Sequence, residues 1–272
     1  MAARERGVVS VFDVITMGRI GVDDSFVSSV PDIPTPVTFC EIFPPDDFPL
    51  YFYRLPKAPD LEIYPEELDL DAIRAADVFW VTGTGLSAEP SREATLHALR
   101  TRGKRGITVL DLDYRPMFWA SREEARARYQ EALPHVTVAV GNQDECDTAV
   151  GIRDPHDAAQ ALHAAGIGLA VVKQGPKGVL ASRLGTDGQP ATEVTVPPVP
   201  VDVVNGLGAG DAFGGALCHG LRAGWDTERI MRFANTAGAI VASRLACADA
   251  MPTLDEVEAL MNTGLEEAVR AR

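Results

Sequence analysis

Runs of apolar, β-branched residues alternate along this chain with stretches whose apolar residues recur at helical spacing. From Asp69 onward the alternation is regular, and it predicts strands that are separated by helices. The strands expected in this part are Val78–Thr82, Ile107–Leu112, Val136–Val140 and Leu169–Lys173. Strands that are joined through helices pair in parallel, so the pattern predicts an α/β fold with helices on both faces of a parallel sheet.

Shorter apolar runs precede the regular part. Val11–Ile20 has the composition of a buried first strand, and two shorter strands are expected at Val37–Phe43 and Leu50–Arg54. The chain contains no internal repeat and no low-complexity linker. We therefore expect a single domain over residues 1–272, with residues 34–60 as a sheet-like appendage.

Helix starts and one hairpin are also marked in the sequence. The capping box, in which two side chains satisfy each other's backbone N–H groups, is matched by Ser121 with Glu124 and by Thr253 with Glu256. Asp154 precedes a proline and is expected to cap another helix. A helix over about Thr227–Leu245 carries a core-facing stripe of Ile230, Ala234, Ala237 and Val241. Val179–Arg183 and Thr192–Val196 are expected to form an antiparallel hairpin.

The composition restricts the possible partners. The chain has 272 residues, with 25 lysines and arginines against 39 aspartates and glutamates, which gives a formal net charge of −14. Nucleic acids need a basic surface, so this charge argues against them as partners. An anion would instead have to be bound by a local feature of the protein, such as a helix N-terminus or a single well-placed cation.

The sequence gives no support for a zinc protein, a membrane protein or a secreted protein. The four cysteines (Cys40, Cys146, Cys218 and Cys247) are scattered without a Cys-x-x-Cys motif, and no Cys/His cluster has zinc-ligand spacing. No run of 18 uncharged apolar residues indicates a transmembrane helix, and the apolar run near the N-terminus is too short for a signal peptide. We therefore expect reduced thiols, a cytoplasmic location and no contact with membranes.

The glycine-rich stretch Asn205–Gly215 is the most informative segment for chemistry. Its glycines follow the spacing of neither a dinucleotide fingerprint nor a Walker A loop. Small residues directly before a helix let several backbone N–H groups point at one spot, which favours an anion. Asp211, at the head of that helix, would be placed to take a proton from an attacking hydroxyl. The alternative is a tight turn in which Asp211 is an ordinary first-turn charge.

Three further segments follow predicted strands. Lys173–Gly178 could approach a flat or charged ligand, or form an ordinary turn with solvated lysines. Asn142 and Glu145 could hold a hydrated Mg²⁺ through waters, although Asn142 could equally be a simple helix N-cap. Arg115, in the segment after Ile107–Leu112, could clamp an anionic group. Together with residues 82–85, these segments share the carboxyl edge of the predicted sheet, where open parallel sheets bind ligands.

Four segments match a set of motifs that occur together. Asn205–Phe213 has the form of a Gly-Ala-Gly-Asp signature, Phe12–Arg19 of a first strand, Asn142–Glu145 of an Asn-x-x-Glu motif, and Lys173–Gly178 of a nucleotide-binding glycine segment. In this combination they resemble the PfkB, or ribokinase-like, family of carbohydrate kinases. Segments at 38–46, 52–54, 56–60 and 113–116 resemble one branch, whose substrate is a keto-deoxy sugar acid of bacterial myo-inositol breakdown.

The resemblance implies a fold and a reaction. The fold would be the ribokinase-like three-layer α/β/α arrangement, with a mostly parallel sheet and a small β lid. The reaction would be ATP-dependent phosphorylation of the primary hydroxyl of 5-dehydro-2-deoxy-D-gluconate, with Mg²⁺ as the metal cofactor. The implied partners are ATP and the sugar acid, together with a second copy of the chain bound through the lid.

The resemblance also implies roles for individual residues. Asp211 would be the general base, and the backbone N–H groups of Gly208, Ala209 and Gly210 would form the anion hole. The nucleotide would be bound by Lys173, Gly175, Gly178 and Asn235, while Asn142 and Glu145 would organise Mg²⁺ through water. The sugar acid would be held by Asp23, Arg54, Lys57 and Arg115, since cations suit its carboxylate.

The sequence departs from the family pattern in two places. Asn205 stands where many relatives have aspartate, which argues against the monovalent-cation site of some members. Relatives also have a lid element, a Gly-Gly-x-x-x-Asn sugar-binding segment and a further βα unit where Gly21–Phe26 joins the first strand directly to the next segment. One βα unit is therefore expected to be missing. The alternatives to the kinase are a catalytically impaired nucleotide-binding remnant and a sister kinase for 2-keto-3-deoxygluconate or fructose.

Overall fold

The computed structural model describes residues 8–10, 25–44, 47–54, 57–185 and 191–270. Contacts along the chain divide it into two compact units. The first comprises Met1–Pro36, Arg54–Lys173 and Leu180–Glu193, and the second comprises Val37–Tyr53, Gln174–Val179 and Val194–Arg272. The expectation of a single domain with an appendage at residues 34–60 stays a prediction.

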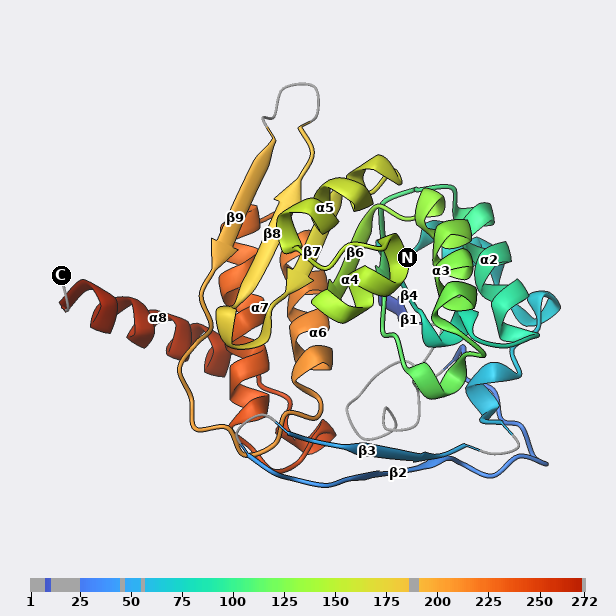
Figure 1. The fold of residues 1–272 in the computed structure, drawn as a ribbon, viewed down its shortest axis with the longest axis horizontal. Coiled ribbons are helices and arrows are strands. Elements are labelled where there is room, and N and C mark those ends of the chain that lie inside the picture. Colours follow the sequence, from blue (N-terminus) through green and yellow to red (C-terminus); the bar gives the residue numbers. More distant parts are fainter. Residues whose placement is uncertain (1–7, 11–24, 45–46, 55–56, 186–190, 271–272) are drawn as a thin grey trace, which may run out of the picture. The chain divides into compact units, whose positions relative to one another are not determined.

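A sheet of seven strands forms the framework (Figure 1). Its strands are β1 (Val8–Ser10), β4 (Val78–Thr82), β5 (Ile107–Asp111), β6 (Val138–Asn142), β7 (Leu169–Lys173), β8 (Val179–Arg183) and β9 (Thr192–Val196), paired in that order. The pairs β1–β4, β4–β5, β5–β6 and β6–β7 are parallel. The parallel sheet predicted from the alternation of strands and helices is therefore confirmed.

Most predicted strands lie where the apolar runs placed them, but β6 begins two residues later than expected. The reason is that Val136 closes a 3₁₀ turn, because its N–H donates to the carbonyl of Leu133. Pairing in register then starts only at Val138, opposite Val109. The first strand expected at 11–20 lies outside the described residues, and β1 directly precedes it.

The described residues of the first unit form five α-helices, and the sequence predicted the capping of two of them. They are α1 (Leu70–Ala75), α2 (Ser91–Arg102), α3 (Arg122–Ala132), α4 (Gln143–Val150) and α5 (Pro155–Ala164). Asp154 caps α5 as expected, because its carboxylate accepts the N–H groups of His156 and Asp157. The box predicted at the start of α3 is only half formed. Ser121 accepts the N–H of Glu124, but the Glu124 carboxylate accepts the N–H of Ala120 instead of that of Ser121.

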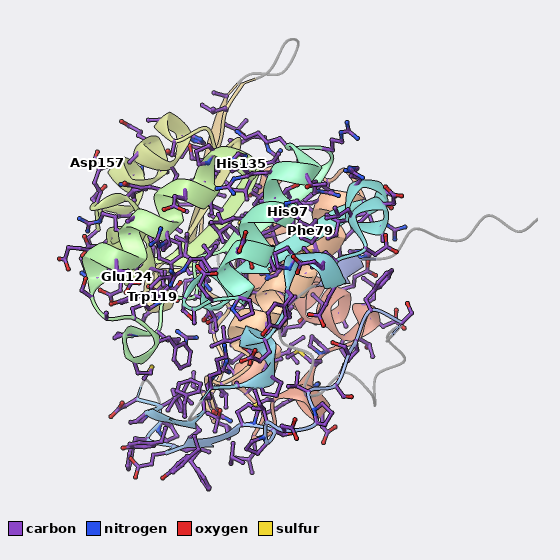
Figure 2. The ribbon with its side chains drawn as sticks, turned by 90° about the vertical axis from the view of Figure 1, so that its right-hand side faces the viewer. Phe79, His97, Trp119, Glu124, His135 and Asp157 are labelled. Atoms are coloured by element: carbon purple, nitrogen blue, oxygen red, sulfur yellow. The ribbon has the colours of Figure 1, made fainter. Side chains whose placement is uncertain are left out.

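The core of the first unit lies between the sheet and these helices. Phe79 on β4 and Trp119 before α3 are both buried (Figure 2), and the ring of Trp119 packs against that of Tyr129. Arg102 of α2 is buried in the same core. Its guanidinium donates to the carbonyls of Ile73, Ala76 and Ile107 and to the hydroxyl of Thr108. This arginine therefore ties the end of α1 to β5.

In the described part of the second unit there are three α-helices and a separate small sheet. The helices are α6 (Ala209–Arg222), α7 (Thr227–Ala242) and α8 (Leu254–Arg270), and α6 and α7 pack side by side (Figure 1). The stripe predicted on α7 is confirmed, since all four of its residues are buried. The capping box of Thr253 and Glu256 is present with both hydrogen bonds.

The small sheet consists of two antiparallel strands, β2 (Val37–Cys40) and β3 (Leu50–Tyr53). Two cross-strand pairs, Val37 with Tyr53 and Phe39 with Tyr51, share one face. Their side chains are 51%, 67%, 58% and 49% exposed, respectively. β2 ends three residues earlier than predicted; beyond Cys40 the two segments are joined by a hydrogen bond from Glu41 N–H to the carbonyl of Pro49 and by an isolated bridge between Phe43 and Asp47.

Among the described residues, no helix is long and apolar enough to cross a membrane. Within the same residues, no disulfide joins any of the four cysteines.

Candidate active site

The loop that leads into α6 is fixed by Asn205. This side chain is buried, its Oδ1 accepts the N–H of Leu207 at 3.0 Å, and its Nδ2 donates to the carbonyl of Leu245 at 2.8 Å. An aspartate could make the first contact but has no donor for the second. Asparagine at this position therefore has a structural use, which is to tie the glycine loop to the segment that follows α7.

The start of α6 has the form of an anion site. Gly208 is the N-cap in a left-handed conformation with φ of +86°, and no side chain caps the helix. A Cβ atom on Gly208 would lie 3.3 Å from the Cβ of Cys247. This crowding and the positive φ together favour glycine at position 208. The N–H groups of the first turn are therefore left without a side-chain cap; that of Ala209 donates to the carbonyl of Gly206 at 3.3 Å, and an uncapped helix start such as this favours an anion.

Asp211 lies in the first turn of α6 and is exposed. It borders a hollow of about 280 Å³ within the second unit. The hollow is lined by Asp211, Ala212, Gly215, Ala216 and His219 of α6, Phe233 and Ala237 of α7, and Met251–Leu254 with Val257. A carboxylate beside an uncapped helix start and an open hollow can reach a bound hydroxyl, which is the geometry a general base needs.

Cys247 lies next to this helix start. Burial raises the pKa of the Cys247 thiol, and the negative charges of Asp211 and Cys40 raise it further. The thiol is therefore neutral at physiological pH, and the Cα and Cβ atoms of Cys247 are the ones that lie beside Gly208.

The glycine segment after β7 has one structurally constrained residue. Gly178 has φ of +88°, and a side chain there would collide with the carbonyl of Val196. Asn235 of α7 donates from Nδ2 to the carbonyl of Pro197 at 3.0 Å, directly after β9. Gly175 also has a positive φ, of +56°, with open space around it. The roles of Gly175, Gly178 and Asn235 in nucleotide binding stay predictions.

In the first unit, polar side chains meet at the carboxyl ends of β4, β5 and β6. Asn142 and Glu145 form a complete capping box at the start of α4. The Asn142 Oδ1 accepts the N–H of Glu145 at 2.9 Å, and the Glu145 Oε2 accepts the N–H of Asn142 at 2.6 Å. The alternative that Asn142 is an N-cap is therefore correct, while the metal-binding role stays a prediction.

Arg115 lies between two carboxylates. Its Nη2 is 2.9 Å from Oδ1 of Asp113, and its Nη1 is 3.7 Å from Oε1 of Glu145. Asp113 also accepts a hydrogen bond from the hydroxyl of Thr84 at 2.7 Å. These contacts form a chain across the strand ends from Thr84 to Glu145.

Lys173, at the end of β7, is surrounded by the same charges. Burial alone would lower the pKa of Lys173, but the carboxylates of Asp111, Glu145 and Asp113 outweigh it and hold this pKa above its ordinary value. The lysine is therefore charged at all physiological pH values. Its ammonium serves as a counter-ion to the carboxylates of this cluster.

The donor set fits a hydrated Mg²⁺ better than a directly coordinated one. No group of three or more His, Cys, Asp or Glu side chains is arranged to hold a metal among the described residues. Glu145 keeps one oxygen, Oε1, outside the capping box. Mg²⁺ retains several waters in most proteins, so one carboxylate oxygen that accepts from a metal-bound water is sufficient.

The other predicted sugar-binding residues are engaged in ion pairs. Arg54 pairs with Asp60 at 2.5 Å, and its guanidinium lies 4.9 Å from the ring centre of Phe118. Lys57 pairs with Glu62 at 2.6 Å. Asp23 lies outside the described residues.

The sequence did not single out Thr84 or Asp113 as site residues. Both follow strands that were predicted correctly, and Asp113 lies two residues before Arg115. The contact between them joins residues 29 positions apart, so it depends on the pairing of β4 with β5. The hollow beside Asp211 was also missed, because it depends on the packing of α6, α7 and the start of α8.

Comparison with known proteins shows the fold and the family of this chain. The family model described as pfkB family carbohydrate kinase matches residues 16–254. The fructokinase of Xylella fastidiosa, solved with bound ATP, has a TM-score of 0.70 at 23% identity, covering 84% of this chain and 74% of that one. The fold is therefore the ribokinase-like three-layer α/β/α fold, and the chain belongs to the pfkB family of sugar kinases.

Two similar relatives within the family carry the same enzyme name. The 5-dehydro-2-deoxygluconokinase of Shouchella clausii is 34% identical over 229 residues, which are 83% of this chain and 68% of the relative. The enzyme of the same description from Geobacillus thermodenitrificans is 35% identical over 231 residues, 82% of this chain and 66% of the relative. The chain thus spans about two thirds of the length of these relatives.

Proposed function

We propose that this chain transfers the γ-phosphoryl group of ATP to the primary hydroxyl of 5-dehydro-2-deoxy-D-gluconate. Membership of the pfkB family and the similarity to 5-dehydro-2-deoxygluconokinases support this assignment. The observation that carries it in this structure is Asp211, an exposed carboxylate in the first turn of a helix that no side chain caps.

The start of α6 would perform the chemical step. Asp211 accepts the proton of the sugar hydroxyl as its oxygen attacks the γ-phosphorus, and the bond to the bridging oxygen of ADP breaks. The N–H groups of Gly208, Ala209 and Gly210 would stabilise the charge on the phosphoryl oxygens. When bound, Mg²⁺ would neutralise phosphate charge, and Asn142 with Glu145 would hold its waters.

The nucleotide and the sugar acid would use the remaining predicted residues. Lys173, Gly175, Gly178 and Asn235 would line the nucleotide. The carboxylate of the sugar acid would be met by a cation, with Arg54, Lys57 and Arg115 as the candidates. Each of these cations has an ion-pair partner here, so a sugar carboxylate would have to replace or join that partner.

The substrate is tested by measuring ADP release from ATP with a panel of acceptors. We expect a higher kcat/KM with 5-dehydro-2-deoxy-D-gluconate than with 2-keto-3-deoxygluconate or fructose, because relatives that are 34% and 35% identical are named for the first substrate, whereas the fructokinase is 23% identical. A preference for fructose or for 2-keto-3-deoxygluconate would contradict the assignment of the substrate while leaving the kinase class intact.

A second candidate function is nucleotide binding with little phosphoryl transfer. It is favoured by the sequence, in which the family's Gly-Gly-x-x-x-Asn sugar-binding segment does not occur. ATP binding without acceptor-dependent ADP release would support this candidate over the kinase.

We also propose that the exposed face of β2–β3 binds a second copy of the chain. The face carries Val37, Phe39, Tyr51 and Tyr53, all about half exposed or more. The rings of Phe39 and Tyr53 pack edge to face at 5.5 Å, which joins the two strands on this face. Such a surface on a two-stranded sheet is typical of an interface.

Light scattering after gel filtration tests this dimer. Phe39→Lys should give a monomer, because it places a charge in the centre of the face. Thr38→Lys adds the same charge to the opposite face and should leave the dimer intact. A parent chain that is monomeric at micromolar concentration would refute the interface.

A further inference from the structure

Arg115 lies closer to one carboxylate than to the other. It is 2.9 Å from Asp113, which is a hydrogen-bonded ion pair, and 3.7 Å from Glu145, which is beyond hydrogen-bond distance. Glu145 is nearly buried, with 6% of its side chain exposed, and its Oε1 faces Arg115. Oε1 is also the oxygen that the capping box leaves available.

Asp113 is held in an uncommon backbone conformation. Its φ is +31°, a region that residues other than glycine seldom occupy. Two hydrogen bonds fix it there: the Thr84 hydroxyl donates to Oδ2 at 2.7 Å, and the Asp113 N–H donates to Oδ1 of Asp111 at 3.2 Å. Strained residues held by several contacts concentrate at functional sites.

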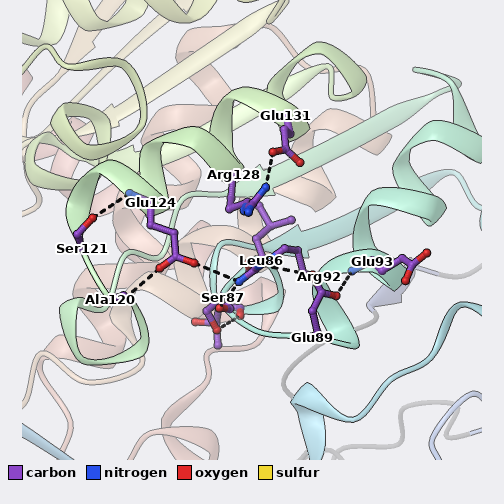
Figure 3. A network of polar contacts seen from close by, with 11 residues as sticks. Leu86, Ser87, Glu89, Arg92, Glu93, Ala120, Ser121, Glu124, Arg128 and Glu131 are labelled. Carbon is purple, nitrogen blue, oxygen red and sulfur yellow. Dashed lines mark hydrogen bonds and ion pairs between the residues drawn. The ribbon is translucent and has the colours of Figure 1, made fainter.

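Thr84 is itself part of a rigid loop. The loop after β4 contains a 3₁₀ turn at Thr84–Leu86, and the guanidinium of Arg92 donates to the carbonyls of Leu86 at 2.8 Å and Ser87 at 2.7 Å. Arg92 also lies 3.5 Å from Glu124 at the start of α3 (Figure 3). The position of Asp113 is thus set by a network that reaches back to α2 and α3.

We propose that Asp113 is a positioning residue that holds Arg115 away from Glu145 and so keeps the Oε1 of Glu145 available to the water shell of Mg²⁺. The inference rests on the proposed function for the role of Glu145. What it adds is that the carboxylates of Asp113 and Glu145 compete for the guanidinium of Arg115. Without the charge of Asp113, Arg115 closes on Glu145 and occupies the oxygen that the metal-bound waters require.

Three variants test this competition: Asp113→Asn, Arg115→Met and the double variant. Asparagine tolerates a positive φ and can still accept from Thr84, so the loop keeps its shape. The measurement is the Mg²⁺ concentration for half-maximal binding of a fluorescent ATP analogue. Asp144→Asn is the matched control, because it removes an exposed charge on the residue next to Glu145.

The expected result is a rise of about tenfold in that Mg²⁺ concentration for Asp113→Asn, equivalent to ~1.4 kcal/mol. Arg115→Met and the double variant should behave alike and need no more Mg²⁺ than the parent, since the competitor is gone. Binding of the analogue in EDTA should be the same in all variants. A double variant as impaired as Asp113→Asn would overturn the proposal, because the effect would then not pass through Arg115.

A crystal structure of the Asp113→Asn variant gives a readout that does not depend on nucleotide binding. Arg115 should have a guanidinium nitrogen within hydrogen-bond distance of Glu145. An Arg115 that stays where it is would overturn the proposal. If Arg115 moves but the parent chain shows no Mg²⁺-dependent nucleotide binding, the positioning by Asp113 is supported and the proposed function fails.

Discussion

Arg102 is a buried residue that joins several segments of the first unit. Its buried guanidinium donates to three carbonyls and one hydroxyl that come from α1, β5 and the residues next to them. Arg102→Met would leave these acceptors buried without donors. Hydrogen bonds to charged groups contribute about 1.5–3 kcal/mol each, so we expect the free energy of unfolding to fall by about 3 kcal/mol or more. Urea denaturation measures this change.

The matched control for Arg102 is Arg100→Met on the same helix, where the side chain is exposed. It should change the free energy of unfolding by less than about 0.5 kcal/mol. Equal losses in both variants would show that the buried contacts of Arg102 have no special weight.

The reactivity of Cys247 reports on the charge of Asp211. Because burial, Asp211 and Cys40 all raise the pKa of Cys247, little thiolate is present at pH 7.5, and alkylation by iodoacetamide should be slower than that of an ordinary thiol. Asp211→Asn removes one negative charge, lowers the pKa of Cys247 and should speed its alkylation. The rate is measured at this residue by mass spectrometry of peptides.

Cys146 is the internal reference for that experiment. Burial raises its pKa to about 12, so it should stay unmodified in the folded chain of both variants. An alkylation rate of Cys247 that does not change in Asp211→Asn would mean that the carboxylate does not act on the thiol.

Among the helices and strands, the start of α6 gives a direct prediction about the affinity for ATP. Gly210→Val places a β-branched side chain among the N–H groups of the first turn and should crowd a bound phosphate. We expect the affinity for ATP to fall at least tenfold, measured by isothermal titration calorimetry. Ala223→Val adds a β-branched side chain at the exposed far end of the same helix and should leave the affinity unchanged. Unchanged binding in a folded Gly210→Val variant would show that this helix start is only a turn.

The elements could be predicted from the sequence wherever a single local signal decided them. The limits of β4 and β7 coincide with apolar runs, and the capping of α5 follows from Asp154 and the proline after it. The shift of β6 was not predictable, because it depends on a turn that uses Val136.

The residues of the candidate site could likewise be predicted only where a short sequence motif contains them. Asp211 and the pair of Asn142 and Glu145 belong to short motifs, and the sequence identified them as candidates. The chain of contacts from Thr84 to Glu145 needs three strands to pair in the correct register, and no short segment contains that information.

At the scale of the whole molecule, the lack of a Gly-Gly-x-x-x-Asn segment in the sequence has a direct consequence. Phosphoryl transfer depends mainly on positioning and on the exclusion of water, so a chain without the sugar-binding glycine segment should turn over slowly. Inserting the corresponding segment of a relative between Val22 and Asp24 should raise kcat by orders of magnitude and leave ATP affinity within about threefold. Full activity of the 272-residue chain as it stands would contradict this expectation.

We propose that Asp211 acts as the base in the transfer of phosphate to the sugar acid. The most direct test of this claim is the transfer of label from γ-³²P-ATP to 5-dehydro-2-deoxy-D-gluconate by the parent chain and by Asp211→Asn, run side by side. The parent should form labelled sugar phosphate, even if slowly, and Asp211→Asn should be slower by about 10²–10⁴-fold with little change in ATP affinity. Equal rates of labelling in the two chains, or no labelling by the parent, would contradict the claim.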